Sequence, residues 1–380
     1  MMAQLVGIGS LLVWAYLILA HGRFWWAGER DDRVPPDPRV WPEVAVVVPA
    51  RDEADVIGRA IGSLLAQDYP GRLRLTLVDD GSSDGTAQRA RQAAEAIGSD
   101  RLTIVAATPP PRGWTGKLSA VAQGVEAAGE QPRYLWLTDA DIVHAPDTAR
   151  SLVARAEADG LVLNSLMAEL RCESAAERAL IPAFVFFFQM LYPFARVNRP
   201  ASPVAGAAGG CVLLRRDAFA RAGGVAAIAD ALIDDCALGG LMKKQGPIRL
   251  ALTRRSRSIR PYGGWREIGA MVSRSAYAQL RYSPLLLAAT LAGMALVYLA
   301  PPLLALFASG AARFAGLVAW GLMAMSFQPT LRFYRRSPGW GLALPLIAAF
   351  YAGATFFSAW QHWQGRGGLW KGRVQAQLRS

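Results

Sequence analysis

Uncharged apolar runs divide the chain into segments of two kinds. Four runs carry no charged residue, and they cover residues 1–20, 283–312, 314–331 and 337–365. Each is comparable in length to the roughly 20-residue α-helix that crosses a bilayer. They predict an N-terminal transmembrane anchor over residues 1–22 and about three C-terminal transmembrane helices over residues 284–362.

Between the anchor and the C-terminal block, short β-rich runs alternate with amphipathic stretches. Residues 44–48 are predicted to form a strand, and the apolar positions of residues 56–65 then recur at the spacing of a buried helical face. The same order repeats, with strands at 73–78, 102–105 and 134–138 and helices that begin near Asp84, Thr115 and Pro146. This order predicts an α/β fold with a doubly wound, mostly parallel, Rossmann-like sheet, plus the transmembrane α-helices. Ligands bind such sheets outside the carboxyl ends of the strands.

Acidic residues follow two of these strands. Asp139 and Asp141 come directly after the strand 134–138, and Asp80 follows the strand 73–78. Two neighbouring carboxylates repel each other unless a cation or protons compensate their charge, and a hard divalent ion also keeps positions open for phosphate oxygens. We therefore expect a metal ion at Asp139 and Asp141, in one site with Asp80.

The net charge of +12 is informative mainly because many of the basic residues lie in one stretch of the sequence. Eight Arg and one Glu lie between Arg249 and Arg281. We expect residues 251–283 to form a basic interfacial segment that contacts an anionic lipid bilayer, at about 1 kcal/mol per basic residue. Its helix over 265–282 would turn four apolar side chains to lipid: Ile268, Met271, Val272 and Tyr277. Nucleic acid is not an expected partner, because no nucleic-acid-binding module accompanies the charge.

The flanks of the anchor predict its orientation. No Lys or Arg precedes the anchor, whereas Arg23, Arg30 and Arg33 follow it, so the next domain is expected in the cytosol. The three cysteines show no disulfide framework and no zinc-site spacing, which agrees with a domain in the cytosol. A cleaved signal peptide is disfavoured, because a basic n-region and a small-x-small site are missing. We expect a multi-pass protein of a bacterial-type inner membrane.

The C-terminal topology has two solutions. Three spans would leave the basic tail, residues 363–380, on the outer side, against the positive-inside rule. Either Pro301-Pro302 break the first block into a re-entrant hairpin, or the last apolar block lies partly in the interface.

Six short motifs follow one another in a specific order. They are Val48-Pro-Ala-Arg-Asp-Glu53, Val78-Asp-Asp-Gly-Ser-Ser-Asp-Gly-Thr86, Gly116-Lys117, Thr138-Asp-Ala-Asp141, Gly209-Gly-Cys-Val-Leu-Leu-Arg215 and Leu232-Ile-Asp-Asp-Cys-Ala-Leu238. Over residues 43–250 they resemble the motifs of family 2 glycosyltransferases with the GT-A fold. Residues 170–193 and the segment ending at Arg373 are similar to the hopanoid-biosynthesis-associated (hopene-associated) branch. The resemblance implies a cytosolic GT-A catalytic domain over residues 40–250.

The resemblance also implies roles for single residues. Asp141, with Asp139 in support, would hold Mg²⁺ or Mn²⁺, and Asp235 would be the catalytic base. The nucleotide-sugar donor would contact seven residues: Pro49, Arg51, Asp52, Glu53, Asp80, Lys117 and Asp139. Three alternatives stay open. Lys117 can be a solvated lysine at a helix start, Asp234-Asp235 can merely cap a helix, and His144 can be an extra ligand or a polar surface residue.

The implied function is inverting transfer of one sugar from a nucleotide diphosphate sugar, with UDP favoured by the resemblance, to the hydroxyl of a membrane lipid acceptor of hopanoid type. Processive polymer synthesis is disfavoured, because the Q-x-x-R-W motif is replaced by Gln279-Leu-Arg-Tyr282. Two alternatives remain: a polyprenyl-phosphate glycosyltransferase and a catalytically silent membrane scaffold of a lipid-synthesis complex.

Overall fold

The computed structural model describes residues 1–366, 369–370 and 373–374, and the chain divides into two compact units. The sheet unit comprises Glu29–Arg171 and Arg196–Arg260, and the helical unit comprises Met1–Gly28, Cys172–Ala195 and Pro261–Ser380. Ten of the 18 residues of the predicted basic tail, and four of the nine residues of the C-terminal motif that ends at Arg373, lie outside the described residues.

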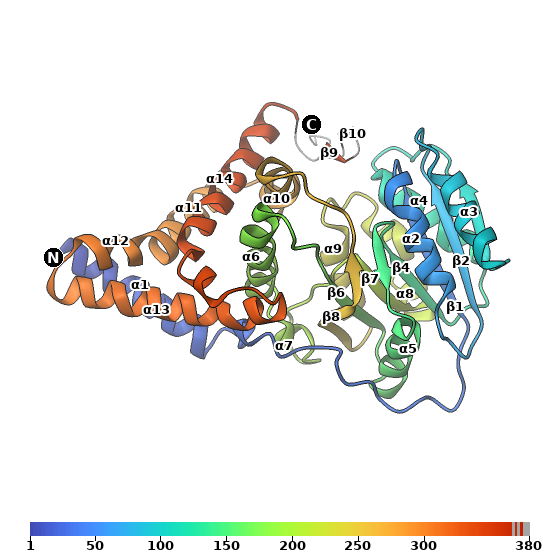
Figure 1. Ribbon diagram of the computed structural model, residues 1–380, viewed down its shortest axis with the longest axis horizontal. Helices are drawn as coiled ribbons and strands as arrows, with labels where there is room; N and C mark the ends of the chain where they lie inside the picture. The colour runs from blue at the N-terminus through green and yellow to red at the C-terminus, as the bar shows by residue number, and fades with distance from the viewer. Residues whose placement is uncertain (367–368, 371–372, 375–380) are drawn as a thin grey trace. The chain divides into compact units, whose positions relative to one another are not determined.

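The sheet unit is built on eight strands in the order β3-β2-β1-β4-β7-β6-β8-β5 (Figure 1). Their bounds are β1 Val44–Ala50, β2 Leu73–Asp79, β3 Leu102–Ala106, β4 Tyr134–Thr138, β5 Ile142–His144, β6 Leu163–Glu169, β7 Cys211–Arg215 and β8 Ile248–Ser258. Strands β1 to β4 pair in parallel and so do β6 and β8, whereas β7 runs antiparallel to both of its neighbours. The predicted mostly parallel α/β sheet is confirmed.

Three crossover helices cover the two faces of the sheet. They are α2 Ala54–Leu65, α3 Thr86–Ile97 and α4 Gly116–Ala127. The chain moves outward from β1 to β2 and β3, and then returns to β4 on the other side of β1. Because such crossovers are right-handed, α4 covers the opposite face of the sheet from α2 and α3. The strand order reverses between β1 and β4, which is where ligands bind in doubly wound sheets.

The two sides of β1 have different packing partners. Every residue of this strand is buried, as expected for a parallel strand covered on both faces. Val46 and Val48 belong to one large core cluster with Ile57 and Ile61 of α2. Val47 points the other way, and together with Val78 of β2 it lies directly under Gly124 of α4. The glycine therefore lets α4 approach the sheet closely.

Further helices of the sheet unit follow β5 and β7 along the chain. They include α5 Thr148–Ala158, α8 Arg216–Arg221, the 3₁₀ helix η2 Gly224–Ile228 and α9 Asp234–Lys243. A one-turn helix, α7 Phe194–Val197, lies at the boundary between the two units.

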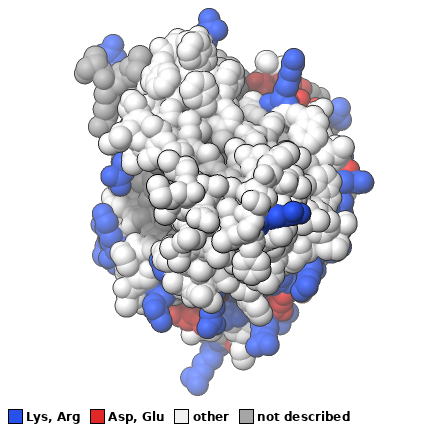
Figure 2. Space-filling view, turned by 90° about the vertical axis from the view of Figure 1, so that its left-hand side faces the viewer, with Lys and Arg blue, Asp and Glu red and all other residues white. Residues whose placement is uncertain are grey.

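The helical unit contains long apolar helices. Its elements are α1 Met2–Leu19, η1 Phe24–Trp26, α6 Ala175–Leu191, α10 Trp265–Gln279, α11 Pro284–Met294, η3 Ala295–Leu299, α12 Ala300–Phe307, α13 Gly310–Phe333, η4 Pro338–Gly341, α14 Leu344–Trp363 and the two-residue strands β9 Leu369–Trp370 and β10 Arg373–Val374. Figure 2 shows a face on which charged side chains are sparse and gather toward the margins. Among the exposed apolar side chains are Leu5 of α1, Phe307 of α12 and Phe314 of α13.

Four helical segments are long and apolar enough to cross a membrane, by length and composition, in the part of the chain that the structure describes. They are Met2–Leu19, Ala175–Val197, Pro284–Phe307 and Gly310–Phe333. The first and the last two match predicted spans. Helix α14, which occupies the third predicted C-terminal span, is not among them. The remaining segment, Ala175–Val197, was not predicted as a span. That segment holds the aromatic residues Phe184 to Phe188, and 61% of its apolar window is buried.

Pro301-Pro302 do not break the first C-terminal block into a hairpin. Helices α11 and α12 join through η3, a π-helical turn over Ala295–Leu299, so the helix continues from Pro284 to Phe307. Proline removes a backbone donor and clashes with the preceding turn of an α-helix. A wider π turn just before the prolines relieves both problems, which is a usual cause of such turns.

The apolar side chains of α10 do not face outward as expected. Ile268, Val272 and Tyr277 are buried within the helical unit. The backbone N–H of Tyr277 donates to Ser358 Oγ of α14 at 3.0 Å, and its ring lies against Trp363. Helix α14 therefore covers the face that was predicted to contact lipid.

The predicted basic segment 251–283 is divided between the two units, and several of its arginines are neutralised within the sheet unit. Residues up to Ser258 form β8 of the sheet. Arg255 pairs with Asp31 and Asp147, and Arg257 pairs with Glu169. These acids come from distant parts of the sequence, so the local excess of arginine overstated the charge that this stretch can offer to a bilayer.

We expect Gly124→Ala to destabilise the protein. A Cβ at this position would lie 2.4 Å from Val47 Cγ1 and 2.8 Å from Val78 Cγ2, on strands that cannot yield easily. Overpacking of this kind costs about 1–3 kcal/mol of unfolding free energy. Thermal melts of the full chain in detergent measure it. The matched control is Gly58→Ala in α2, where a Cβ has only one neighbour, at 3.9 Å, and where a gain of about 0.5–1 kcal/mol is expected. Equal effects of the two substitutions would contradict this account of α4 packing.

Candidate functional site

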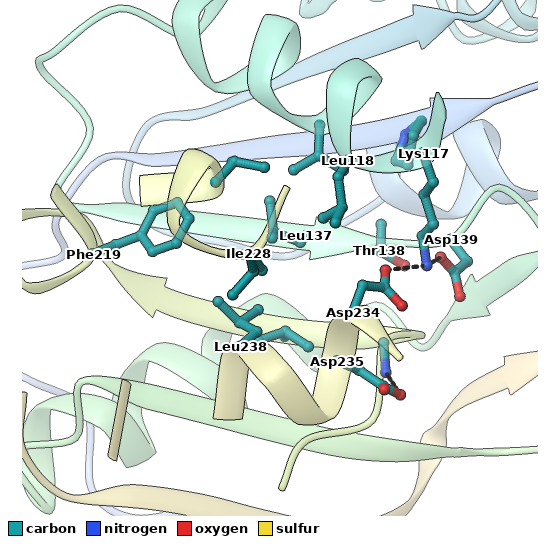
Figure 3. Close-up of a pocket in the computed structure, with 15 residues that line it drawn as sticks. Lys117, Leu118, Leu137, Thr138, Asp139, Phe219, Ile228, Asp234, Asp235 and Leu238 are labelled. Carbon is teal, nitrogen blue, oxygen red and sulfur yellow. Dashed lines mark hydrogen bonds and ion pairs between the residues drawn. The ribbon is translucent and has the colours of Figure 1, made fainter. Parts of the chain in front are cut away.

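A cavity in the sheet unit opens at the carboxyl ends of β1 and β4, where the strand order reverses (Figure 3). Its polar end is formed by Lys117, Thr138, Asp139, Asp234 and Asp235. Its other walls are apolar and come from β1, α4, β4, β7, α8, η2 and α9, with Pro49, Leu118, Val121, Leu137, Val212, Phe219, Val225, Ile228 and Leu238, besides Gly209. Four of the predicted site residues, Pro49, Lys117, Asp139 and Asp235, thus line one cavity.

Lys117 lies at the start of α4 and bridges two carboxylates. Its Nζ is 2.9 Å from Asp139 Oδ1 and 3.0 Å from Asp234 Oδ2. The helix start is fixed by Thr115, whose side chain accepts a hydrogen bond from the N–H of Leu118. Burial alone would lower the pKa of Lys117, but attraction by Asp139 and Asp234 outweighs it and raises the pKa well above its usual range. Lys117 is therefore not the solvated lysine of the alternative interpretation.

Asp141 lies beyond Asp139 and has different partners. Its Oδ2 accepts hydrogen bonds from Ser258 Oγ at 3.0 Å and from Arg260 Nε at 3.2 Å. Burial raises the pKa of Asp141, the negative charge of Asp139 raises it further, and Arg260 opposes both. The two predicted metal ligands therefore lie close enough to repel each other.

The carboxylates of Asp139 and Asp141 fit a hard divalent ion that takes most of its ligands from substrate phosphates and water. Among the described residues, no group of three or more His, Cys, Asp and Glu is arranged to hold a metal ion. Mg²⁺ is commonly bound by one or two carboxylates, together with substrate phosphates and water. Asp139 and Asp141 meet that smaller requirement, and a cation between them would relieve the repulsion that raises the pKa of Asp141.

The predicted nucleotide-site residues at the ends of β1 and β2 lie next to one another. Arg51 Nη1 is 3.6 Å from Asp80 Oδ2, and Asp80 is buried. Asp52 adopts a left-handed backbone with φ +50°, and its Oδ1 accepts a hydrogen bond from the N–H of Ser83 at 2.9 Å. Glu53 pairs with Arg260 and so connects this group to Asp141.

Asp235 lies in the first turn of α9, on the other side of the cavity from α4. Its Oδ2 accepts a hydrogen bond from the N–H of Gly209 at 3.2 Å, and its Oδ1 accepts one from the N–H of Cys236 at 2.7 Å. Burial raises the pKa of Asp235 to about 6, repulsion from Asp234 adds to the shift, and Lys117 and both N–H groups limit it. Helix capping does not explain these bonds, because the N-cap of α9 is Ile233, which has no side-chain capping bond, and Gly209 belongs to a separate loop.

His144 is neither a polar surface residue nor close to a cluster of metal ligands. It is 4% exposed, and its ring lies between Thr138 Oγ1 and Ser256 Oγ, each 2.9 Å away. Burial lowers its pKa to about 3. The expectation of surface exposure was wrong, because β5 is a strand of the sheet and its last side chain points into the core.

Two residues contribute to the site although the sequence does not predict their contacts. Arg260 was counted only as part of a basic segment, although it contacts Glu53 and Asp141, which are 207 and 119 residues away in the chain. Asp234 was named only as the neighbour of Asp235, although it is the second partner of Lys117. No local sequence signal points to either role, because each contact joins segments that are far apart in the sequence and meet only in the folded unit.

The middle of the chain matches a known family. Residues 45–223 match the family model described as Glycosyl transferase family 2. An N-acetylglucosaminyltransferase of Mesorhizobium japonicum is 29% identical over 149 residues, which are 38% of this chain and 34% of that protein. An N-acetylglucosaminyltransferase of Rhizobium leguminosarum bv. viciae is 34% identical over 112 residues, which are 29% of this chain and 24% of that protein. The chain thus spans about a third and a quarter of the length of these curated relatives.

A solved structure shares the fold over most of the chain. The mannosyltransferase PcManGT from Pyrobaculum calidifontis, in complex with GDP-Man and Mn²⁺, aligns with a TM-score of 0.60 at 19% sequence identity. The alignment covers 94% of this chain and 99% of that chain. This likeness concerns the fold, and it confirms the predicted GT-A architecture.

The raised pKa of Asp235 predicts a pH-dependent cost in stability. The folded state holds a proton on this group up to about pH 6, whereas the ordinary carboxyl value is 3.8. The free energy of unfolding should therefore fall as the pH rises from 4 to 6, because the charged form is disfavoured in the fold. Asp235→Asn, which has no charge to bury, should be more stable than the wild type above pH 6. This advantage should shrink by up to about 3 kcal/mol as the pH falls to 4.

Thermal and urea melts of both proteins between pH 4 and 8 measure the difference. Asp55→Asn, an exposed carboxylate in the first turn of α2, is the matched control and should show no such gain. A difference between Asp235→Asn and the wild type that does not change with pH would contradict a perturbed carboxyl at this position.

Proposed function

Because residues 45–223 match the Glycosyl transferase family 2 model, we propose that the protein is a membrane-bound inverting glycosyltransferase. It would move a single sugar from a nucleotide diphosphate sugar to the hydroxyl of a membrane lipid. One observation carries this proposal. Asp235, whose pKa is raised to about 6 by burial, lines the same cavity as Lys117 and Asp139, and it would act as a base toward a sugar whose diphosphate lies at those two residues.

The nucleotide end of the donor would bind at the ends of β1 and β2. Asp80, Asp52 and Glu53 supply carboxylate oxygens, which accept hydrogen bonds from ribose and base more strongly than neutral groups do. UDP is favoured by the resemblance of the motifs. The two curated relatives are named N-acetylglucosaminyltransferases, and the structural neighbour holds GDP-Man, so N-acetylglucosamine and mannose nucleotides are the first donors to test.

Asp139 and Asp141 would hold Mg²⁺ or Mn²⁺ beside the diphosphate. The ion would act as a Lewis acid that neutralises charge on the departing diphosphate. Lys117 already lies at Asp139 and would add a second, compact positive charge to that end of the cavity. Arg260 holds Asp141 in place through its Nε and Glu53 through its Nη2.

Asp235 would remove the proton of the acceptor hydroxyl. The acceptor oxygen forms a bond to the anomeric carbon of the sugar as the bond from that carbon to the diphosphate oxygen breaks. The electron pair leaves with the nucleoside diphosphate, and the proton stays on Asp235 until solvent takes it. A carboxylate with a pKa near 6 suits this task, because general bases work best when their pKa is near the working pH.

The acceptor would come from a bilayer. Three of the apolar helical segments, Met2–Leu19, Pro284–Phe307 and Gly310–Phe333, support a multi-pass, inner-membrane protein with the sheet unit in the cytosol. The fourth, Ala175–Val197, is not counted as a span, because the residues before and after it belong to the same sheet unit. The hopanoid-type lipid rests on the resemblance of residues 170–193. An anionic bilayer as partner now rests on the exposed residues Arg266, Arg274 and Arg281 of the helical unit, because Arg255 and Arg257 are ion-paired in the sheet unit.

Asp141→Asn tests the metal assignment. The substitution keeps the size of the side chain and removes its charge, so metal-dependent binding of UDP should weaken at least about 10-fold and transfer should be lost. Titration calorimetry of UDP with and without Mn²⁺ measures binding separately from catalysis, and melts confirm that the variant is folded. Metal-dependent UDP binding that survives the substitution unchanged would remove Asp141 from the metal site.

Asp235→Asn separates proton removal from donor binding. General-base catalysis contributes about 10²-fold to 10⁴-fold, so the chemical rate should fall by that factor while UDP affinity stays nearly unchanged. Single-turnover transfer of a radiolabelled sugar to extracted membrane lipids measures the rate. Equal losses in rate and in UDP affinity would make Asp235 a donor-site residue. A wild type that binds no nucleotide sugar would favour the scaffold, and transfer only to polyprenyl phosphate would favour the other enzyme.

A further inference from the structure

A buried chain of hydrogen bonds connects the end of β5 to the loop that contacts Asp235. His144 Nε2 lies 2.9 Å from Thr138 Oγ1, and Thr138 Oγ1 donates to the carbonyl of Gly210 at 2.8 Å. The next residue along the chain, Gly209, donates its N–H to Asp235 Oδ2 at 3.2 Å. His144 and Thr138 are 4% and 1% exposed, so water does not compete for these bonds.

The direction of each proton follows from the partners. The carbonyl of Gly210 can only accept, so the Thr138 hydroxyl must donate to it, and the oxygen of that hydroxyl is left to accept. His144 therefore carries its proton on Nε2, and its bare Nδ1 accepts from the hydroxyl of Ser256 at 2.9 Å. The ring of Trp136, 4.7 Å away and edge-on, packs against the imidazole and limits its rotation.

These hydrogen bonds begin where the ladder between β4 and β7 ends. Strands β4 and β7 pair up to Thr138 opposite Cys211, and no further pair holds Gly210 or Gly209. The hydroxyl of Thr138 then links β4 to Gly210, while the other side of the loop is held at Ala208, which exchanges two hydrogen bonds with Ser165 of β6. A shift of that hydroxyl would carry Gly210 with it, and the N–H of Gly209 would lose its alignment with Asp235.

We propose that His144 is a positioning residue: by donating its Nε2 proton to Thr138, it holds the Gly209–Gly210 loop so that the N–H of Gly209 stabilises the charged form of Asp235. This inference rests on the proposed function, in which Asp235 is the base. Its role differs from that of a metal ligand or an acid, because the ring touches neither the cavity nor Asp235. Burial keeps the imidazole neutral, with a pKa of about 3, so the donor and acceptor directions do not change across the working pH range.

Two substitutions of similar polarity separate the two ends of the ring. In His144→Gln, the amide reaches the position of Nε2 and can still donate to Thr138. In His144→Asn, the shorter side chain places its amide near the position of Nδ1, where it meets Ser256 but not Thr138. Both variants lose one buried partner, so they should lower the melting temperature by similar amounts. Only His144→Asn should affect Asp235.

The first readout does not require transfer activity. The pKa of the Asp235 carboxyl is measured by NMR on protein labelled with ¹³C-carboxyl aspartate, and the signal is assigned by its loss in Asp235→Asn. We expect His144→Asn to raise this pKa by about half a unit to one unit, because a hydrogen bond to the carboxylate is lost. His144→Gln should leave it near the wild-type value.

The second readout is kinetic. We expect His144→Asn to lower kcat by about 10-fold to 100-fold with the KM for the donor unchanged, since a small misplacement of a catalytic group has effects of this size. The acid limb of its kcat profile should move up in pH with the carboxyl pKa. His144→Gln should restore most of kcat.

The outcomes distinguish this inference from the proposed function. If both variants lose stability and neither changes the pKa of Asp235, His144 has a structural role alone and the inference fails. Equal pKa shifts in the two variants also overturn it, because the contact with Thr138 would not be the cause. If the wild type transfers no sugar, the proposed function fails, while the NMR titration still decides the positioning role. Should His144→Asn not fold, Thr138→Val removes the same link and is judged by the same two measurements.

Discussion

The ammonium group of Lys117 is the contact on which the arrangement of the site depends. It joins Asp139, at the end of β4, to Asp234, at the start of α9, and these elements are far apart in the sequence. Without this cation, Asp139 and Asp234 would lie at the same cavity with no positive charge between them, and repulsion would tend to separate α9 from β4. The same charge also limits the upward shift of the pKa of Asp235. One side chain thus holds the two sides of the cavity together and limits the rise in the pKa of the proposed base.

The electrostatic balance of the site suggests how ligands would enter. Lys117 and Arg260 are outnumbered by the carboxylates around them, which include Glu53, Asp139, Asp141 and Asp234. A diphosphate would meet net repulsion in such a site, whereas a divalent cation would be attracted to it. Metal and nucleotide sugar are therefore expected to bind cooperatively, because each reduces the electrostatic cost of the other.

The sequence predicted those parts of the fold that are encoded locally. The β-rich runs ending in Val48, Val78 and Thr138 are all strands, and the helix expected over Thr115–Ala128 is α4 with Thr115 as its cap. Their carboxyl ends carry the predicted acidic residues, because parallel strands with alternating helices bring those ends to one edge. Predictions that relied on a local excess of one residue type were less successful. Arg255 and Arg257 of β8 are ion-paired with acids from other parts of the sheet unit, and the apolar face of α10 is covered by α14.

What could not be predicted arises where chain segments meet without a local signal. The antiparallel insertion of β7 beside β4 creates the loop at Gly209, and this insertion also brings Thr138 to Gly210. From the sequence, His144 is expected to be a polar surface residue, because a single His beside a loop is more often exposed than bound to a ligand. Its burial depends on the pairing of β5 with β8, more than 100 residues further along the chain.

Strand β8 also determines what a soluble fragment of this protein must contain. It pairs with β6 on one side and with β5 on the other, and β5 has no other neighbour in the sheet. The family match ends at residue 223, before this strand begins at Ile248. A fragment cut at the end of the match would expose the hydrogen-bonding edge of β6 and leave β5 unpaired, and such open edges promote aggregation. It would also lack Asp235 and Arg260, so a fragment meant to retain the site must extend at least through Arg260.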